Sequence, residues 1–312
     1  MIIDLSEEAA EFGRQALRAF EAAGGDGLVQ RAEVDPSSRE ALVGPVLAEL
    51  GAWDLEPRAD TDSLEAAAAL CRSAGYWALP YPVAERLSRP GDLDVDGLVV
   101  VAADRPSATV AGLDLRWAAT TLDGRRHRVT GTSADGPAFR SRLELSPLDT
   151  DGVADVALAL VLPCWTLLGM LDRAMELTIS HVRLRQQFGQ PLSAFQSVQF
   201  QLTDAEVERT GLDMLAKYTL WSVGEGRDEA LDDALALRMA ALEAAEVVFR
   251  VTHQLHGAVG FCDETTLSWL SRYSQPLRRL PLGLSATRDL LTSRLDRHGL
   301  VGLYGAEREV AQ

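Results

Sequence analysis

The chain has 312 residues, of which 47% are hydrophobic and 24% charged, a composition typical of a globular protein with a sizeable core. Its 30 basic residues are outnumbered by 46 acidic ones, and the net charge of −16 argues against nucleic acid as a partner. The cysteines support neither a disulfide framework nor a zinc centre, because no CxxC pair or Cys/His cluster accompanies Cys71, Cys164 and Cys262.

We expect a cytoplasmic protein without a membrane span. The opening residues, MIIDLSEEAAEF, are acidic and lack the basic segment of a signal peptide. The longest apolar stretch, residues 156–171, is shorter than the ~18–20 residues that cross a bilayer, and it contains Pro163. Because Asp155 and Asp172 flank this stretch, a buried helix explains it better.

Helical periodicity dominates residues 4–77. A first helix is predicted from apolar residues that recur every three or four positions and end before Gly24: Leu5, Ala9, Phe12, Ala16 and Phe20. A second helix is predicted to start at Asp35, a capping residue followed by Pro36, and a third covers residues 63–76. The Pro-rich residues 79–92, LPYPVAERLSRPGD, then interrupt the helical pattern.

Residues 93–150 change to short β-like runs separated by Gly, Asp and Pro, with a hairpin turn predicted at Asp123 and Gly124. From residue 153 to about residue 297 the pattern is helical again, and a loop at residues 222–230 divides two long apolar faces. Long antiparallel helices with short connections predict a four-helix bundle. The predicted fold is therefore mainly α with a small β region.

The first candidate site is residues 185–196, RQQFGQPLSAFQ, at the end of a long helix. An arginine at this position commonly just complements the helix dipole. Here Arg185 and Phe188 are expected at one exposed corner, where the guanidinium fork can hold a phosphate beside an aromatic ring that packs on a nucleotide. Arg183 is interpreted as a surface charge.

The second candidate site is residues 254–261, QLHGAVGF. A helix that ends in a glycine cap explains the pattern structurally, but Gln254 can also bond a ligand, and Gly257 permits close backbone approach. Neither segment is a GxGxxG phosphate loop. His253 and His256 lack an accompanying ligand set, so no metal site is predicted.

In this order, the two segments resemble the acyl-CoA dehydrogenase family. The likeness extends to LSWLSRYSQPLRRLPLGLSAT at residues 267–287 and to the opening helix, DLSEEAAEFGRQALRAF. It implies three domains: an N-terminal helical domain (1–88), a reduced middle β domain (89–151), and a C-terminal helical bundle with an FAD-binding corner (152–312).

The resemblance implies an FAD enzyme that oxidises an acyl-CoA thioester at Cα–Cβ. In this family the C-terminal domain of one subunit holds the adenosine and pyrophosphate part of its neighbour's FAD. Four residues match those positions and are our cofactor-binding prediction: Arg185, Phe188, Gln254 and Gly257.

The carboxylate that removes the α-proton in this family has no counterpart in the sequence. Leu282 occupies its usual position, and a one-residue shift in the alignment gives Pro281. Some members carry the base near the start of the first C-terminal helix, where this chain has Ala159 and Leu160. We therefore predict no catalytic residue in this chain. The middle region also lacks the family's flavin-binding elements, which argues against isoalloxazine binding by this chain.

This pattern resembles the shortened subunit of heteromeric (α2β2) acyl-CoA dehydrogenases of actinobacterial steroid side-chain and cholesterol degradation; GYWALPYPVAERL at residues 75–87 carries part of the likeness. The resemblance implies a full-length partner that carries the base and most of the acyl-CoA contacts. Two alternatives stay open. One is a self-sufficient dehydrogenase with a relocated base such as Asp263 or Glu264, and the other is a non-enzymatic helical interaction protein.

Overall fold

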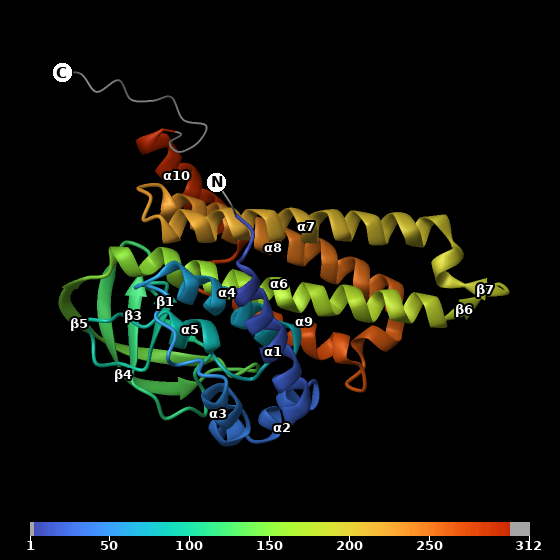
Figure 1. Ribbon diagram of the computed structural model, residues 1–312, viewed down its shortest axis with the longest axis horizontal. Helices are drawn as coiled ribbons and strands as arrows, with labels where there is room; N and C mark the ends of the chain where they lie inside the picture. Colours follow the sequence, from blue (N-terminus) through green and yellow to red (C-terminus); the bar gives the residue numbers. More distant parts are fainter. Residues whose placement is uncertain (1–2, 300–312) are drawn as a thin grey trace.

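The computed structural model describes residues 3–299, in which helices pack around a small sheet (Figure 1). The first part of the chain is helical. Its elements are α1 (Glu7–Ala23), α2 (Gly27–Val34), the 3-10 turn η1 (Pro36–Ser38), α3 (Arg39–Glu49), α4 (Thr61–Tyr76) and α5 (Val83–Leu87). The Ser6 hydroxyl caps α1, and Gly24, whose φ of 136° suits glycine, ends it as predicted.

A five-stranded sheet follows, with the strand order β1-β3-β4-β5-β2. Its strands are β1 (Gly97–Val101), β2 (Ser107–Ala108), β3 (Trp117–Thr121), β4 (Arg125–Ala134) and β5 (Ser141–Asp151). The predicted hairpin is confirmed, because β3 and β4 pair antiparallel across Asp123 and Gly124. A buried ion pair between Arg126 on β4 and Asp155, 2.7 Å apart, fixes the sheet to the next helix.

Long helices form the rest of the described chain, and the predicted mainly helical fold with a small β region is confirmed. The elements are α6 (Val153–Leu184), β6 (Gln186–Gln187), β7 (Gln190–Pro191), η2 (Leu192–Ala194), α7 (Gln196–Gly224), α8 (Ala230–His256), η3 (Gly257–Phe261), α9 (Thr266–Arg279) and α10 (Leu284–His298). Helices α6, α7 and α8 lie side by side, and α10 packs on α8 (Figure 1).

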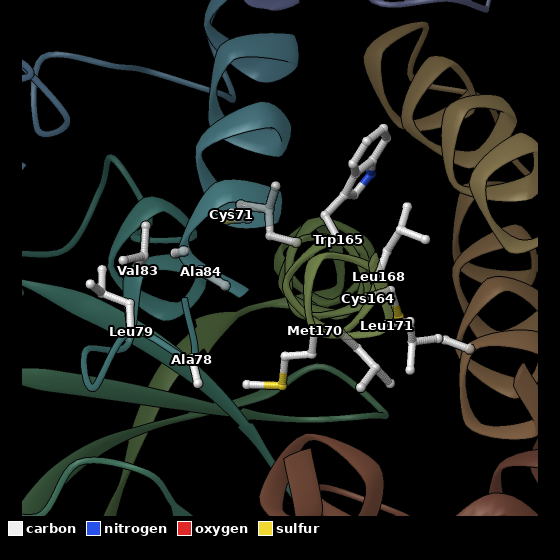
Figure 2. Close-up of a cluster of buried hydrophobic side chains, with 14 of the residues drawn as sticks. Cys71, Ala78, Leu79, Val83, Ala84, Cys164, Trp165, Leu168, Met170 and Leu171 are labelled. Atoms are coloured by element: carbon white, nitrogen blue, oxygen red, sulfur yellow. The ribbon is translucent and has the colours of Figure 1, made fainter. Parts of the chain in front are cut away.

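Helix α6 is the centre of the core. Its own apolar side chains point outward in several directions and are buried, as Figure 2 shows for Cys164, Trp165 and Leu168. Cys71 of α4 belongs to the same cluster of buried side chains. The helix has 32 residues, so it is longer than the apolar stretch suggested. It is long and apolar enough to cross a membrane, but 72% of its most apolar window is buried inside the fold, as in the core helix of a globular protein.

Two glycines let α4 and α6 approach each other closely. A Cβ atom on Gly169 of α6 would lie 1.8 Å from the carbonyl oxygen of Arg72, and one on Gly75 of α4 would lie 1.8 Å from that of Thr166. The backbones therefore touch at this crossing. This contact joins the N-terminal helices to the bundle.

The sequence interpretation was wrong at two places in the N-terminal part. Helix α2 was not predicted, and the Pro-rich residues 79–92 contain helix α5 rather than an uninterrupted break. Pro82 directly precedes α5, where its missing N–H costs no helical hydrogen bond. Asp35 does cap a turn, but the turn is η1, and the α-helix itself begins at Arg39.

Candidate functional site

The Arg185 segment forms a tight hairpin at the end of the bundle that lies opposite the sheet (Figure 1). The extended backbone of Arg185 ends α6, and the Leu192 N–H donates to the Arg185 carbonyl over 2.8 Å. Phe188 and Gly189 form the tip between β6 and β7, both with positive φ (52° and 82°), which a two-residue hairpin of this kind requires. The hairpin holds the Arg185 backbone at the mouth of the site.

The second segment ends α8. Gly257 has φ 64° and ψ −147°, a conformation that is essentially restricted to glycine. The chain then turns into η3, which carries it across the end of α8. Gln254 lies exposed in the last turn of the helix. The glycine is therefore required by the backbone, apart from any role in binding.

The structure brings three of the four predicted cofactor residues together. Arg185, Gln254 and Gly257 line one open cavity of about 530 Å3 between the ends of α6, α7 and α8. Among residues 3–299, no carboxylate lines this cavity; its remaining lining residues are His181, Gln187, Leu192, Val198, Gln201, Leu255, His256, Ala258 and Val259. Within residues 3–299, the Arg185 guanidinium has no ion-pair or hydrogen-bond partner. Its donors are thus free for an anion.

The fourth residue, Phe188, does not line the cavity. Its side chain is 92% exposed, and its ring meets the Phe195 ring edge-on, with centroids 6.3 Å apart. A phenylalanine in this position gains almost no burial within the chain, although its backbone is held in the left-handed region. The side chain is available to a group outside this chain.

The histidines near the cavity form stacked pairs. His181 of α6 stacks on His256 of α8, with centroids 4.3 Å apart and planes 20° apart, and His253 stacks on Phe261. Partial burial is the main cause that lowers the pKa of all three imidazoles. Among the described residues no group of three His, Cys, Asp or Glu could hold a metal ion.

The positions considered for a catalytic base meet at an interior cavity of only about 50 Å3. Ala159 and Leu160 of α6 and Pro281 line it, together with strands β1 and β2. Leu282 is fixed beside it through its carbonyl oxygen, which accepts a hydrogen bond of 2.7 Å from Arg238. A drug-sized ligand occupies ~300–1,000 Å3, so this space admits water rather than an acyl thioester.

Asp263 and Glu264 do not reach this cavity. Both lie exposed between η3 and α9, and Asp263 pairs with Arg272 over 2.8 Å. The carboxylate that lines the cavity is Glu85 of α5, which sequence reasoning missed. Burial raises the pKa of Glu85, and the nearby Arg39 opposes this effect. The available signal was a single acid within the apolar residues of VAERL.

Comparisons with known proteins show which fold the chain has. Residues 161–281 match the family described as acyl-CoA dehydrogenase, C-terminal domain. The solved structure described as "Tcur3481-Tcur3483 steroid ACAD G363A variant" superimposes with a TM-score of 0.76 at 20% identity, over 93% of this chain and 98% of that chain. The chain has the acyl-CoA dehydrogenase fold.

Further solved structures and curated proteins are similar to this chain. The ChsE4-ChsE5 complex from Mycobacterium tuberculosis gives a TM-score of 0.71 at 17% identity, over 96% of this chain and all of that chain. Acyl-CoA dehydrogenase FadE28 from Mycobacterium tuberculosis is 33% identical over 56% of this chain and 53% of its own length. 3-Sulfinopropanoyl-CoA desulfinase from Paraburkholderia xenovorans is 24% identical over 70% of this chain and 55% of its own. The chain spans about half the length of these curated relatives.

The acyl-CoA dehydrogenase match contains the open cavity but stops at the edge of the interior one. Arg185, Gln254 and Gly257 lie inside residues 161–281. Ala159 and Leu160 precede the match, and Leu282 follows it by one residue. The likeness to this C-terminal domain therefore covers the candidate cofactor site.

Proposed function

We propose that this chain is a subunit of a heteromeric, FAD-dependent acyl-CoA dehydrogenase and completes the FAD site of its partner in trans. The observation that carries the proposal is the open cavity at the end of the bundle. It combines a free guanidinium, an exposed amide side chain and an open glycine backbone, without any lining carboxylate, in a chain of net charge −16. Such a set suits a phosphate group.

The residues fit one half of FAD and not the other. A cavity of about 530 Å3 has room for the adenosine diphosphate part, with Arg185 and Gln254 as its ligands. The interior cavity of about 50 Å3 has no room for an isoalloxazine ring. We therefore assign the ring, the catalytic carboxylate and most of the acyl-CoA contacts to a full-length partner in an α2β2 complex.

The surface around the open cavity supports a partner at this end. Large apolar side chains are exposed on the segments that form it: Leu184, Phe188, Phe200, Val259 and Phe261. Exposed apolar groups that gather in one region commonly mark an interface. Phe188, which contacts only Phe195 among ring partners here, is then covered by the cofactor or the partner.

In the proposed reaction an acyl-CoA loses a proton from Cα and a hydride from Cβ, giving the enoyl-CoA. FAD supplies the hydride acceptor when it is bound. This chain positions the cofactor: the Arg185 guanidinium binds the charged diphosphate, and the Gly257 backbone allows the ligand to approach closely. The solved structure described as a steroid ACAD supports a bulky, steroid-derived acyl group. A role in lipid and cholesterol catabolism and a cytoplasmic location belong to the same proposal.

The test replaces each of two nearby arginines by alanine, in separate variants. Arg185→Ala in the complex should weaken FAD binding ~10- to 100-fold, because a charge-assisted hydrogen bond contributes ~1.5–3 kcal/mol. Arg183→Ala is the matched control: it removes the same charge two residues away, from a residue that lines a different groove. FAD content after gel filtration and the FAD dissociation constant are measured. Equal values for both variants would rule the assignment out.

One observation favours a second candidate, a self-sufficient dehydrogenase. Glu85 lines the same interior cavity as Ala159, Leu160 and Pro281, and its raised pKa suits a general base. This candidate requires the cavity of about 50 Å3 to widen before an acyl thioester can enter. Glu85→Gln separates the two proposals. If Glu85 is the catalytic base, the variant loses its turnover. If Glu85 has no catalytic role, the turnover of the complex is unchanged. A helical interaction protein, the third alternative, predicts that Arg185→Ala and Gln254→Ala leave the partner's activity unaltered.

A further inference from the structure

Two histidines also line the open cavity, and the sequence analysis assigned no binding role to either. His181 comes from α6 and His256 from α8, and both line the cavity with Arg185 and Gln254. Their rings stack at 4.3 Å across the two helices. Both side chains are only half-buried, so they face the cavity instead of filling the core.

A hydrogen bond of His256 determines which of its ring nitrogens can gain a proton. Its Nδ1 lies 2.9 Å from the carbonyl oxygen of Thr252. Because a carbonyl only accepts, Nδ1 carries a hydrogen in the neutral and in the charged ring. A proton gained by His256 therefore goes to Nε2, which leaves the bond to Thr252 intact.

Burial and the charges around the pair disfavour its protonation while the cavity holds no anion. Burial is the largest cause that lowers the pKa of His181, and the positive charge of Arg185 adds to it. Burial lowers the pKa of His256 as well; His181 and His253 add to this, and the Thr252 bond opposes it. No carboxylate from α6, α7, α8 or η3 lines the cavity to compensate.

An anion in the cavity reverses this balance. Negative charge beside an imidazole favours its protonated form. Two stacked rings repel each other when both are charged, so the pair accepts one proton more readily than two. The cavity then presents an imidazolium next to the Arg185 fork.

We propose that the stacked pair His181–His256 is the second half of the phosphate-binding set in this cavity and takes up one proton when a diphosphate binds. This rests on the proposed function, in which the cavity holds the diphosphate of FAD. Since binding and protonation are linked, the affinity rises as the pH falls. Because the dissociation constant changes tenfold for each pH unit over which one full proton is taken up, it falls about ten- to a hundredfold between pH 8 and pH 6.

The experiment uses the full chain and ADP as the probe. Because the terminal phosphate of ADP itself titrates at about pH 6, the protons bound by free ADP at each pH are subtracted. Calorimetric titrations at pH 6, 7 and 8, in buffers of different ionisation enthalpy, give the dissociation constant and the protons taken up for each ADP. We expect uptake approaching one proton at pH 7. His181→Gln and His256→Gln, made separately, should each weaken ADP binding and reduce the uptake, while His127→Gln on β4 keeps both.

The outcomes separate the two proposals. ADP binding that depends on Arg185 but takes up no proton, or His256→Gln and His181→Gln variants that keep the wild-type pH dependence, would overturn the role of the pair and leave the FAD assignment standing. Absence of ADP binding at every pH contradicts both. Far-UV circular dichroism of each variant confirms that the fold is retained, and His181→Gln serves independently if His256→Gln unfolds.

Discussion

Arg185 and Arg238 show how the same side chain serves two purposes in this fold. Arg238 of α8 is 3% exposed and donates to the carbonyl oxygens of Leu277, Leu280 and Leu282, so it holds the connection between α9 and α10. Burial lowers its pKa, and no described carboxylate pairs with it. Arg185 has free donors at an open cavity. The first arginine is structural, and the second is available to a ligand.

Glu85 carries a pH prediction. Its pKa in the folded chain is raised above the unfolded value by burial, so the stabilising protonated form is lost as the pH rises through the folded pKa. Glu85→Gln should therefore unfold a few degrees above the wild type at pH 8 and no higher at pH 4. Thermal unfolding at both pH values measures this, with Glu8→Gln on the exposed face of α1 as control. A Glu85→Gln variant that is less stable at pH 8 would contradict the argument.

Gly257 carries a backbone prediction. Gly257→Ala forces a side chain into φ 64°, ψ −147°, and should cost ~1–3 kcal/mol of unfolding free energy and lower FAD retention in the complex. Gly283→Ala is the matched control, because no heavy atom lies within 4 Å of a Cβ at either position and only Gly257 has a positive φ. Urea unfolding compares the two. Equal stability would show that the glycine is dispensable.

At the level of the elements, the crossing of α4 and α6 connects the N-terminal helices to the bundle. Gly169→Ala should destabilise the chain by ~1–3 kcal/mol, because its Cβ overlaps the backbone of α4. Gly211→Ala in α7 has no neighbour within 4 Å and should gain ~0.5–1 kcal/mol from helix propensity. Chemical unfolding of both variants tests the crossing, and a neutral Gly169→Ala would refute it.

Long elements could be predicted from the sequence, whereas short ones could not. Helices α1 and α4 and the hairpin at Gly124 have strong periodicity or turn residues, so local signals determine them. Helices α2 and α5 have 8 and 5 residues and form where tertiary packing supports them. The division at residues 88 and 151 stays a prediction.

The candidate site also contains residues that could be predicted from the sequence and residues that could not. Arg185 and Gln254 belong to contiguous motifs, so their neighbourhood followed from a family likeness. Glu85 and the pairing of His181 with His256 depend on contacts between distant helices, which no local pattern contains. The exposure of Phe188 agrees with the expected exposed corner, whereas its absence from the cavity lining was not predicted.

Across the whole molecule, the small cavity beside the sheet and the larger cavity at the helix ends lie far apart. The interior cavity, which β1 and β2 line, is too small for a thioester. The open cavity lies between the ends of α6, α7 and α8, and Figure 1 shows these helix ends on the side of the bundle away from the sheet. We propose that a chain built this way offers the open cavity to a cofactor held by another subunit. This is the physical basis of our proposal that it works only with a partner subunit.

The most direct measurement is the flavin absorbance of the purified chain, alone and co-expressed with a full-length acyl-CoA dehydrogenase subunit chosen by gene neighbourhood. We expect a colourless chain alone, and a yellow complex with less than one FAD per chain that reduces an electron acceptor with an acyl-CoA. A yellow and active product from this chain by itself would contradict the shared site and point to Glu85 as its base.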